Sequence, residues 1–146
     1  MNTQPFAADV QASMSGNQIP AIVPAAGRAM ISAIFILSGL SKIAAPAMTI
    51  GYIQSVGLPL PTIAFALSAF VEIVGGIALL LGYRTRVVAG VLALFSLATA
   101  MIFHSALSDQ NQFIHFFKNI AMAGGLLHVI AFGGGRISID ARGNRR

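Results

Sequence analysis

Four apolar segments run through this chain of 146 residues, and two of them are long enough to cross a membrane. Residues 61–82 contain a single charged residue, Glu72, and residues 87–103 contain none. A bilayer core is about 30 Å thick and an α-helix rises about 1.5 Å per residue, so runs of this length predict transmembrane helices. The sequence therefore indicates a small integral membrane protein whose first partner is the lipid bilayer.

The composition supports this class and excludes several kinds of chemistry. Hydrophobic residues make up 56% of the chain and charged residues 9%, whereas soluble domains average about 25% charged residues. The chain has no Cys, which excludes disulfides, a thiol nucleophile and iron–sulfur ligation by this chain. The net charge of +5 does not indicate nucleic-acid binding, because the basic residues lie at helix ends, where membrane orientation explains them.

The pattern predicts an all-α fold, an integral membrane bundle of four transmembrane helices over residues 27–44, 62–81, 87–104 and 117–132. These helices form a transmembrane domain at residues 25–135, between a mobile N-terminal tail at 1–24 and a basic C-terminal tail at 136–146. The short loop at 82–86 predicts that the second and third helices are antiparallel neighbours. The connector at 47–61 is expected to lie on the membrane surface, in part as a short helix.

Basic residues predict the orientation of the helices. Four spans place seven of the nine basic residues on one side of the membrane: Arg28, Arg84, Arg86, Arg136, Arg142, Arg145 and Arg146. Arg84 and Arg86 are the determinants in the loop between the second and third helices, and only Lys42 and Lys118 fall on the other side. Cytoplasmic loops carry the excess of Lys and Arg, so both termini are expected in the cytoplasm.

Two polar residues are predicted at membrane depth. Glu72 lies near the middle of the second helix and His128 lies within the fourth. Because these helices run in the same direction, the two side chains are expected at nearly the same depth and facing each other inside the bundle. Three interpretations remain open: a buried structural pair, a protonated Glu72 bonded to a neighbouring backbone group, and a proton site beside a bound quinone or small phenol.

A second polar cluster is predicted at the outer face. Lys42 ends the first helix and His104 ends the third, while Asp109, His115, Lys118 and Asn119 lie in or near the last connection. Histidines in such a cluster can bind a metal, a haem or a quinone carbonyl. No metal site is predicted, because no His-x3-His or Glu-x-x-His spacing occurs. The alternative is a solvated interface with snorkelling lysines, and no catalytic residue is assigned.

Several short segments resemble the DoxX family of small four-helix bacterial membrane proteins. They are residues 38–43, 52–59 and 71–86, then His104, then residues 117–125. The resemblance implies a four-helix bundle in the bacterial inner membrane. It also implies a link to redox chemistry, since the family name comes from a thiosulfate–quinone oxidoreductase and other members are associated with quinone or catechol stress.

The expected function is a membrane subunit of a redox or quinone-handling system, with quinone as the ligand and a soluble oxidoreductase as partner. No recognisable motif binds a cofactor, which favours a non-catalytic subunit over a self-sufficient enzyme and leaves enzymatic activity open. The alternatives are a small transporter and a structural partner of another membrane complex. A homo-oligomer is also compatible with so small a bundle.

Overall fold

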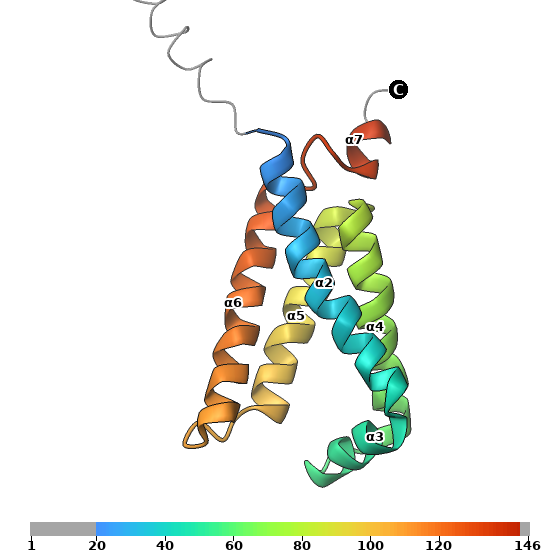
Figure 1. Ribbon diagram of the computed structural model, residues 1–146, viewed down its shortest axis with the longest axis vertical. Helices are drawn as coiled ribbons and strands as arrows, with labels where there is room; N and C mark the ends of the chain where they lie inside the picture. Colours follow the sequence, from blue (N-terminus) through green and yellow to red (C-terminus); the bar gives the residue numbers. More distant parts are fainter. Residues whose placement is uncertain (1–19, 144–146) are drawn as a thin grey trace, which may run out of the picture.

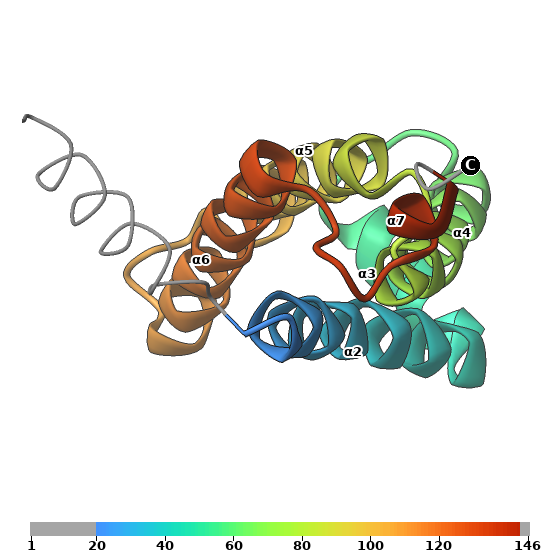
Figure 2. The same cartoon turned by 90° about the horizontal axis from the view of Figure 1, so that it is seen from above.

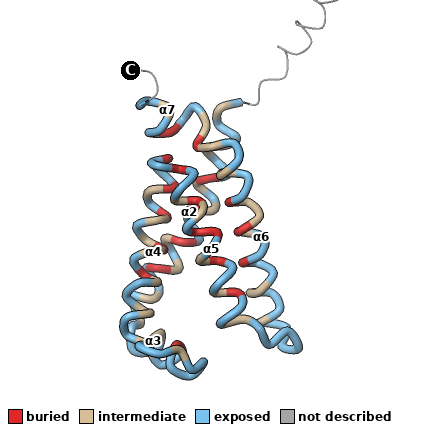
Figure 3. The backbone as a smooth tube through the Cα atoms, turned by 180° about the vertical axis from the view of Figure 1, so that it is seen from behind, coloured by how far each residue is buried: buried red, intermediate tan, exposed pale blue. Residues whose placement is uncertain are grey.

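The computed structural model describes residues 20–143, and within this range the chain is all-α (Figure 1). Its main helices are α2 (Ile22–Ala44), α4 (Pro61–Leu81), α5 (Thr85–Phe103) and α6 (Gln110–Phe132), and all four are long and apolar enough to cross a membrane. Their outer surfaces are covered with exposed apolar side chains, while buried residues lie on the sides that face one another (Figure 3). The prediction of a four-helix transmembrane bundle is therefore confirmed.

The four helices are arranged as two pairs. α2 packs along α4 and α5 packs along α6, whereas α2 and α6 touch only slightly (Figure 2). The two pairs lie close together at the end that carries α7 (Ile139–Gly143) and diverge toward the end that carries α3 (Pro46–Ser55) (Figure 1). This divergence creates the space for the cavity described below.

Two glycines let α2 and α4 approach closely. A Cβ atom on Gly39 would lie 2.6 Å from Cγ1 of Ile73, and one on Gly76 would lie 2.8 Å from Cγ1 of Ile36. Small residues at the interface are how membrane helices gain van der Waals contact, because lipid supplies no hydrophobic force between them. The α2–α4 pair is therefore held by close packing.

Two helices begin earlier than the sequence pattern predicts. α6 begins at Gln110 rather than at residue 117, because the carboxylate of Asp109 caps it by accepting a hydrogen bond from the Gln112 N–H at 2.9 Å. α2 begins at Ile22 rather than at residue 27, and Pro24 is tolerated there because the first turn has no hydrogen bond to lose. Residues 1–19 of the predicted N-terminal tail lie outside the described part of the chain.

The connector between α2 and α4 contains the expected short helix, α3. It packs against α4 and buries Ile53, so it is tied to the bundle through its apolar side. It lies across the end at which the two helix pairs diverge (Figure 1).

The first part of the predicted basic C-terminal tail, up to Gly143, is docked on the bundle. The carboxylate of Asp140 accepts hydrogen bonds from the backbone N–H groups of Arg84 and Thr85, both at 2.8 Å, and from the Thr85 hydroxyl at 2.6 Å. Burial by itself raises the pKa of Asp140, but these hydrogen bonds and the charge of Arg28 outweigh it and hold the pKa below the usual value. Asp140 thus fastens α7 to the start of α5.

Arg28 has a structural role at the same end. The residue is only 3% exposed, so its side chain does not extend into water. Its guanidinium donates to the carbonyl of Leu79 at 3.0 Å and to the carbonyl of Ile137. The Leu79 carbonyl also accepts from the Gly82 N–H at 3.1 Å, so Arg28 adds a second donor at the end of α4 and holds the C-terminal segment over it.

Candidate functional site

A cavity of about 480 Å³ lies between the two helix pairs. Residues from α2, α3, α4, α5 and α6 line it, and most of its surface is apolar. Ligand pockets in proteins typically have about 300–1,000 Å³, mostly apolar walls and a few placed polar groups. The cavity therefore has the size and character of a site for a small amphiphilic molecule.

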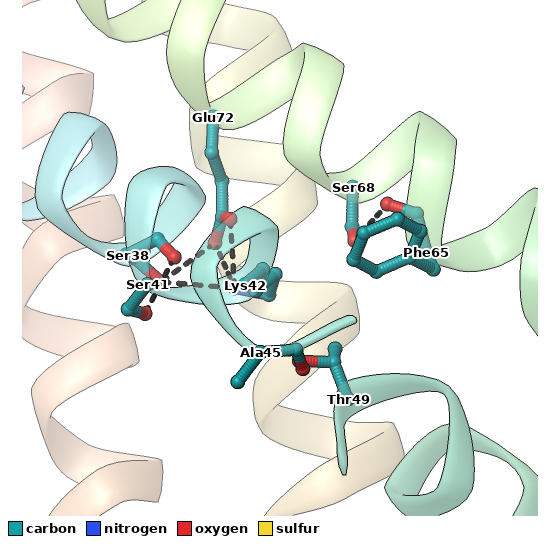
Figure 4. Close-up of polar contacts among 8 residues, drawn as sticks. All are labelled: Ser38, Ser41, Lys42, Ala45, Thr49, Phe65, Ser68 and Glu72. Atoms are coloured by element: carbon teal, nitrogen blue, oxygen red, sulfur yellow. Dashed lines mark hydrogen bonds and ion pairs between the residues drawn. The ribbon is translucent and has the colours of Figure 1, made fainter. Parts of the chain in front are cut away.

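A hydrogen-bonded triad of Lys42, Glu72 and Ser38 forms one polar part of the wall (Figure 4). The Lys42 ammonium donates to both carboxylate oxygens of Glu72, at 2.8 and 2.7 Å, and to the Ser38 hydroxyl at 2.9 Å. The Ser38 hydroxyl in turn donates to Oε1 of Glu72 at 3.0 Å. The side chain of Glu72 is 6% exposed and that of Lys42 is 24% exposed. An acidic residue at membrane depth is thus paired with a cation, as its desolvation requires.

His128 does not take part in this arrangement, so the predicted Glu72–His128 pair is wrong. His128 is exposed on the outer surface of α6, where its Nδ1 lies 3.2 Å from the carbonyl oxygen of Gly124. The reason is the rotation of α6 about its axis. Asn119 lines the cavity, and the nine positions from Asn119 to His128 at about 100° each place them on opposite sides of the helix.

Two histidines and a lysine stand at another part of the cavity wall. The rings of His104 and His115 stack with their centroids 5.1 Å apart. The carbonyl oxygen of the Gln112 amide lies 2.8 Å from Nδ1 of His104, and the Lys118 ammonium donates to Nδ1 of His115 at 2.9 Å. These contacts place the proton of His104 on Nδ1 and that of His115 on Nε2, so one Nε2 is left as an acceptor and the other as a donor.

Two further polar residues line the cavity from α5 and α6. Ser96 is 1% exposed and Asn119 is 8% exposed, and both line the cavity. The Ser96 hydroxyl has no hydrogen-bond partner within residues 20–143. Buried polar groups in proteins are nearly always hydrogen-bonded, so this hydroxyl has hydrogen-bonding capacity left over.

Tyr52 connects α3 to α5 beside the cavity. Its hydroxyl donates to the carbonyl oxygen of Phe103 at 3.0 Å, and the two aromatic rings lie 5.7 Å apart. Because α3 belongs to the α2–α4 side, this contact joins the two helix pairs at the end where they diverge (Figure 1).

The structure thus brings Glu72 together with Lys42, His104, Lys118 and Asn119 in one cavity, where the sequence suggested two separate clusters. Asp109 lies apart from them as the cap of α6. Sequence reasoning missed the contribution of Ser38, although its position four residues before Lys42 on a helix is a signal for side-chain contact. It also missed Ser96 and Tyr52, which carry no signal beyond being polar within or beside an apolar run.

The two predicted orientation determinants do not line the cavity. Arg84 and Arg86 are at the end of the bundle that carries α7, where Arg84 precedes α5 and Arg86 approaches the carbonyl of Ala131 at 3.4 Å. Within residues 20–143, no group of three or more acidic or histidine side chains is placed to hold a metal ion.

Comparisons with known proteins agree with this architecture. The DoxX family model matches residues 23–105. Inner membrane protein YqjF of Escherichia coli K12 is 34% identical over 119 residues, which cover 82% of this chain and 90% of the relative. Inner membrane protein YphA of the same organism is 32% identical over 120 residues, covering 79% and 86%. No solved structure gives a significant match. Since the family model spans more than half of the chain and the relatives are matched over most of their length, this multi-pass inner membrane protein belongs to the DoxX family.

Proposed function

We propose that this protein is a membrane subunit of a redox or quinone-handling system and that its cavity binds the quinone. The observation that carries the proposal is a mostly apolar cavity among membrane-spanning helices with hydrogen-bonding groups concentrated on its walls. A quinone has an apolar ring and tail, and two carbonyl oxygens that need hydrogen-bond donors. Such a molecule matches the cavity in both respects.

The polar residues suggest how the quinone head would be held. The amide of Asn119, the hydroxyl of Ser96 and the Nε2–H of His115 are donors that line the cavity. The triad of Lys42, Glu72 and Ser38 supplies the only acidic side chain that residues 20–143 place on the cavity wall. The quinone would supply the redox chemistry, while this chain would bind it, orient it and keep it at membrane depth.

The electrons are proposed to come from a soluble oxidoreductase that docks on the protein. This part of the proposal is supported by the sequence, which has no Cys and no recognisable cofactor-binding motif. Purification from native membranes in a mild detergent tests it. A soluble oxidoreductase recovered in near-equal amount supports the subunit role, whereas recovery of the protein alone argues for a bundle that acts by itself, such as a small transporter.

The orientation is part of the same proposal. Both termini are placed in the cytoplasm because seven of the nine basic residues then lie on that side. The α3 end, toward which the helix pairs diverge, would then face the periplasm. A green fluorescent protein fused to the C-terminus should fluoresce, and alkaline phosphatase fused after Leu107 should be active. The opposite pattern would reverse the orientation.

A cavity-filling variant tests quinone binding directly. Ala64 lines the cavity, whereas Ala66 on the same helix is exposed and does not line it. We expect purified protein in lipid nanodiscs to bind decylubiquinone saturably, and Ala64→Phe to weaken binding at least about tenfold because the ring occupies the site. The matched control Ala66→Phe should bind like the unmodified protein. Equal binding by the two variants, or no saturable binding at all, would refute the assignment.

A further inference from the structure

The two sides of the cavity differ in how their polar groups are satisfied. On the α2–α4 side, the three N–H bonds of Lys42 meet three acceptors, and both oxygens of Glu72 are bonded. On the α5–α6 side, the buried Ser96 hydroxyl has no partner within the described residues. Asn119, also buried on this side, lines the cavity as well. A ligand head is therefore expected on the α5–α6 side, where hydrogen-bonding capacity is left over.

The charges around the cavity are also unequal. The ion pair at 2.7 Å neutralises Lys42 and Glu72 with each other. Lys118 lines the cavity too, and within the described part of the chain its ammonium bonds only Nδ1 of His115. Asp109 and Asp140, the other acidic residues of the described chain, are engaged at the start of α6 and at the start of α5 and do not line the cavity. Among residues 20–143, the cavity wall thus carries one cation, Lys118, without a counter-ion.

A lysine at a membrane boundary can simply extend its ammonium into water. Lys118, however, is adjacent in sequence to Asn119, and both side chains line the cavity together with Ser96. On the α5–α6 side of the cavity, the Lys118 ammonium, the Asn119 amide and the Ser96 hydroxyl can each donate a hydrogen bond. Together they suit one acidic group, whose oxygens accept several hydrogen bonds. Hydrogen bonds of this kind are about twice as strong when one partner is charged.

From this asymmetry we infer that the cavity selects an amphiphilic organic anion, with a carboxylate or phenolate head on an apolar body. The head is bound at Lys118, Asn119 and Ser96, and the body lies among Phe35, Val71 and Phe95. The inference rests on the ligand cavity of the proposed function and deepens it, because it states which head group that cavity prefers. An ionised phenol is the reduced counterpart of a quinone oxygen, so one site accommodates both.

A matched pair of probes tests the preference. 4-Hexylbenzoate and 4-hexylbenzamide have the same shape and differ in charge. Their saturable binding is measured in nanodiscs of zwitterionic lipid by equilibrium dialysis against protein-free nanodiscs, with decylubiquinone assayed in the same preparation. We expect the benzoate to bind at least about tenfold more tightly than the amide, because one charge-assisted hydrogen bond contributes enough binding free energy for that difference.

Variants assign the preference to the cation. Lys118→Gln should lower the affinity for the benzoate close to the affinity for the amide. Lys118→Arg should retain most of the difference between the two affinities. The side chain of Lys118 is exposed, so neither variant threatens the fold. Arg136→Gln is the matched control, because it removes one exposed positive charge away from the cavity and should leave the preference unchanged.

The outcomes separate this inference from the proposed function. Equal binding of the two probes with normal decylubiquinone binding overturns the anion preference and leaves the quinone site standing. Tight benzoate binding without decylubiquinone binding supports the anion site and overturns the quinone assignment. If neither the benzoate nor decylubiquinone binds, both proposals fail. A preference that survives Lys118→Gln refutes the assignment to that residue.

Discussion

The Lys42–Glu72 pair offers the sharpest test of the structure, because its two charges are buried to different degrees. In Lys42→Met the Glu72 carboxylate keeps only the hydrogen bond from Ser38, and its side chain is 6% exposed. In Glu72→Gln the ammonium remains, but its side chain is 24% exposed and faces the cavity, where water can reach it. Lys42→Met should therefore lower the free energy of unfolding more than Glu72→Gln does.

The geometry sets the size of the effect. Charges 2.7 Å apart attract by about 6 kcal/mol at an effective dielectric constant of about 20, and desolvation of both groups offsets most of this. Leaving one buried charge without its partner costs about 3–5 kcal/mol, which we expect for Lys42→Met. Glu72→Gln should cost about 1.5–3 kcal/mol, the value of hydrogen bonds to a charged group. The double variant removes both charges and should recover at least about 2 kcal/mol relative to Lys42→Met.

The free energy of unfolding can be measured by titrating the purified protein in mixed micelles with sodium dodecyl sulfate. The chain has no Trp, so helix content is followed by far-ultraviolet circular dichroism. Ser68→Ala is the control, because that hydroxyl lines the cavity but bonds only the nearby carbonyl of Phe65. It should change stability by less than about 1 kcal/mol. If the Lys42 and Glu72 substitutions are additive, the two charges are not coupled and the pairing is refuted.

Three further predictions concern the packing of α2 on α4 and the end that carries α7. Gly76→Ala should destabilise the bundle by about 1–3 kcal/mol in the same titration, because its Cβ would contact α2. Gly124→Ala is the control: its Cβ would have open space, so the free energy of unfolding should not fall. Arg28→Lys should cost about 1–3 kcal/mol, since an ammonium cannot span the carbonyls of α4 and the C-terminal segment; unchanged stability would contradict the clamp. Because hydrogen bonds hold the pKa of Asp140 below its usual value of about 3.9, its contribution is complete above that pH and is lost as the pH falls through the lowered value. Protection of the α7 amides from hydrogen exchange, relative to their intrinsic rates at each pH, should therefore fall only in acid. Asp140→Asn should abolish that pH dependence.

The helices themselves were predictable because hydropathy and length are local properties of the sequence. A run of apolar residues about 20 long crosses a bilayer whatever its neighbours do. The errors at helix ends also have local causes, such as the Asp109 cap and the early proline of α2. The polar residues at membrane depth, Glu72 above all, were recognisable for the same reason, since a charge within an apolar run stands out.

The pairing of Glu72 was not predictable from depth alone. Counting residues along the helices places Lys42 at the outer end of the first helix and Glu72 near the middle of the second. Side chains on a helix tilt toward its N-terminus, so the Lys42 ammonium lies back beside Ser38, which brings it to the level of Glu72.

The sequence by itself determined a four-helix bundle of the inner membrane, its family and the identity of its polar residues. Only the tertiary structure decided which of those residues share a cavity, with Lys42 facing Glu72 and His128 turned outward. In a soluble helix the apolar stripe shows which side is buried. Membrane helices are apolar on all sides because lipid is as apolar as the protein interior, so their rotation is set by packing, by small residues and by hydrogen bonds between helices.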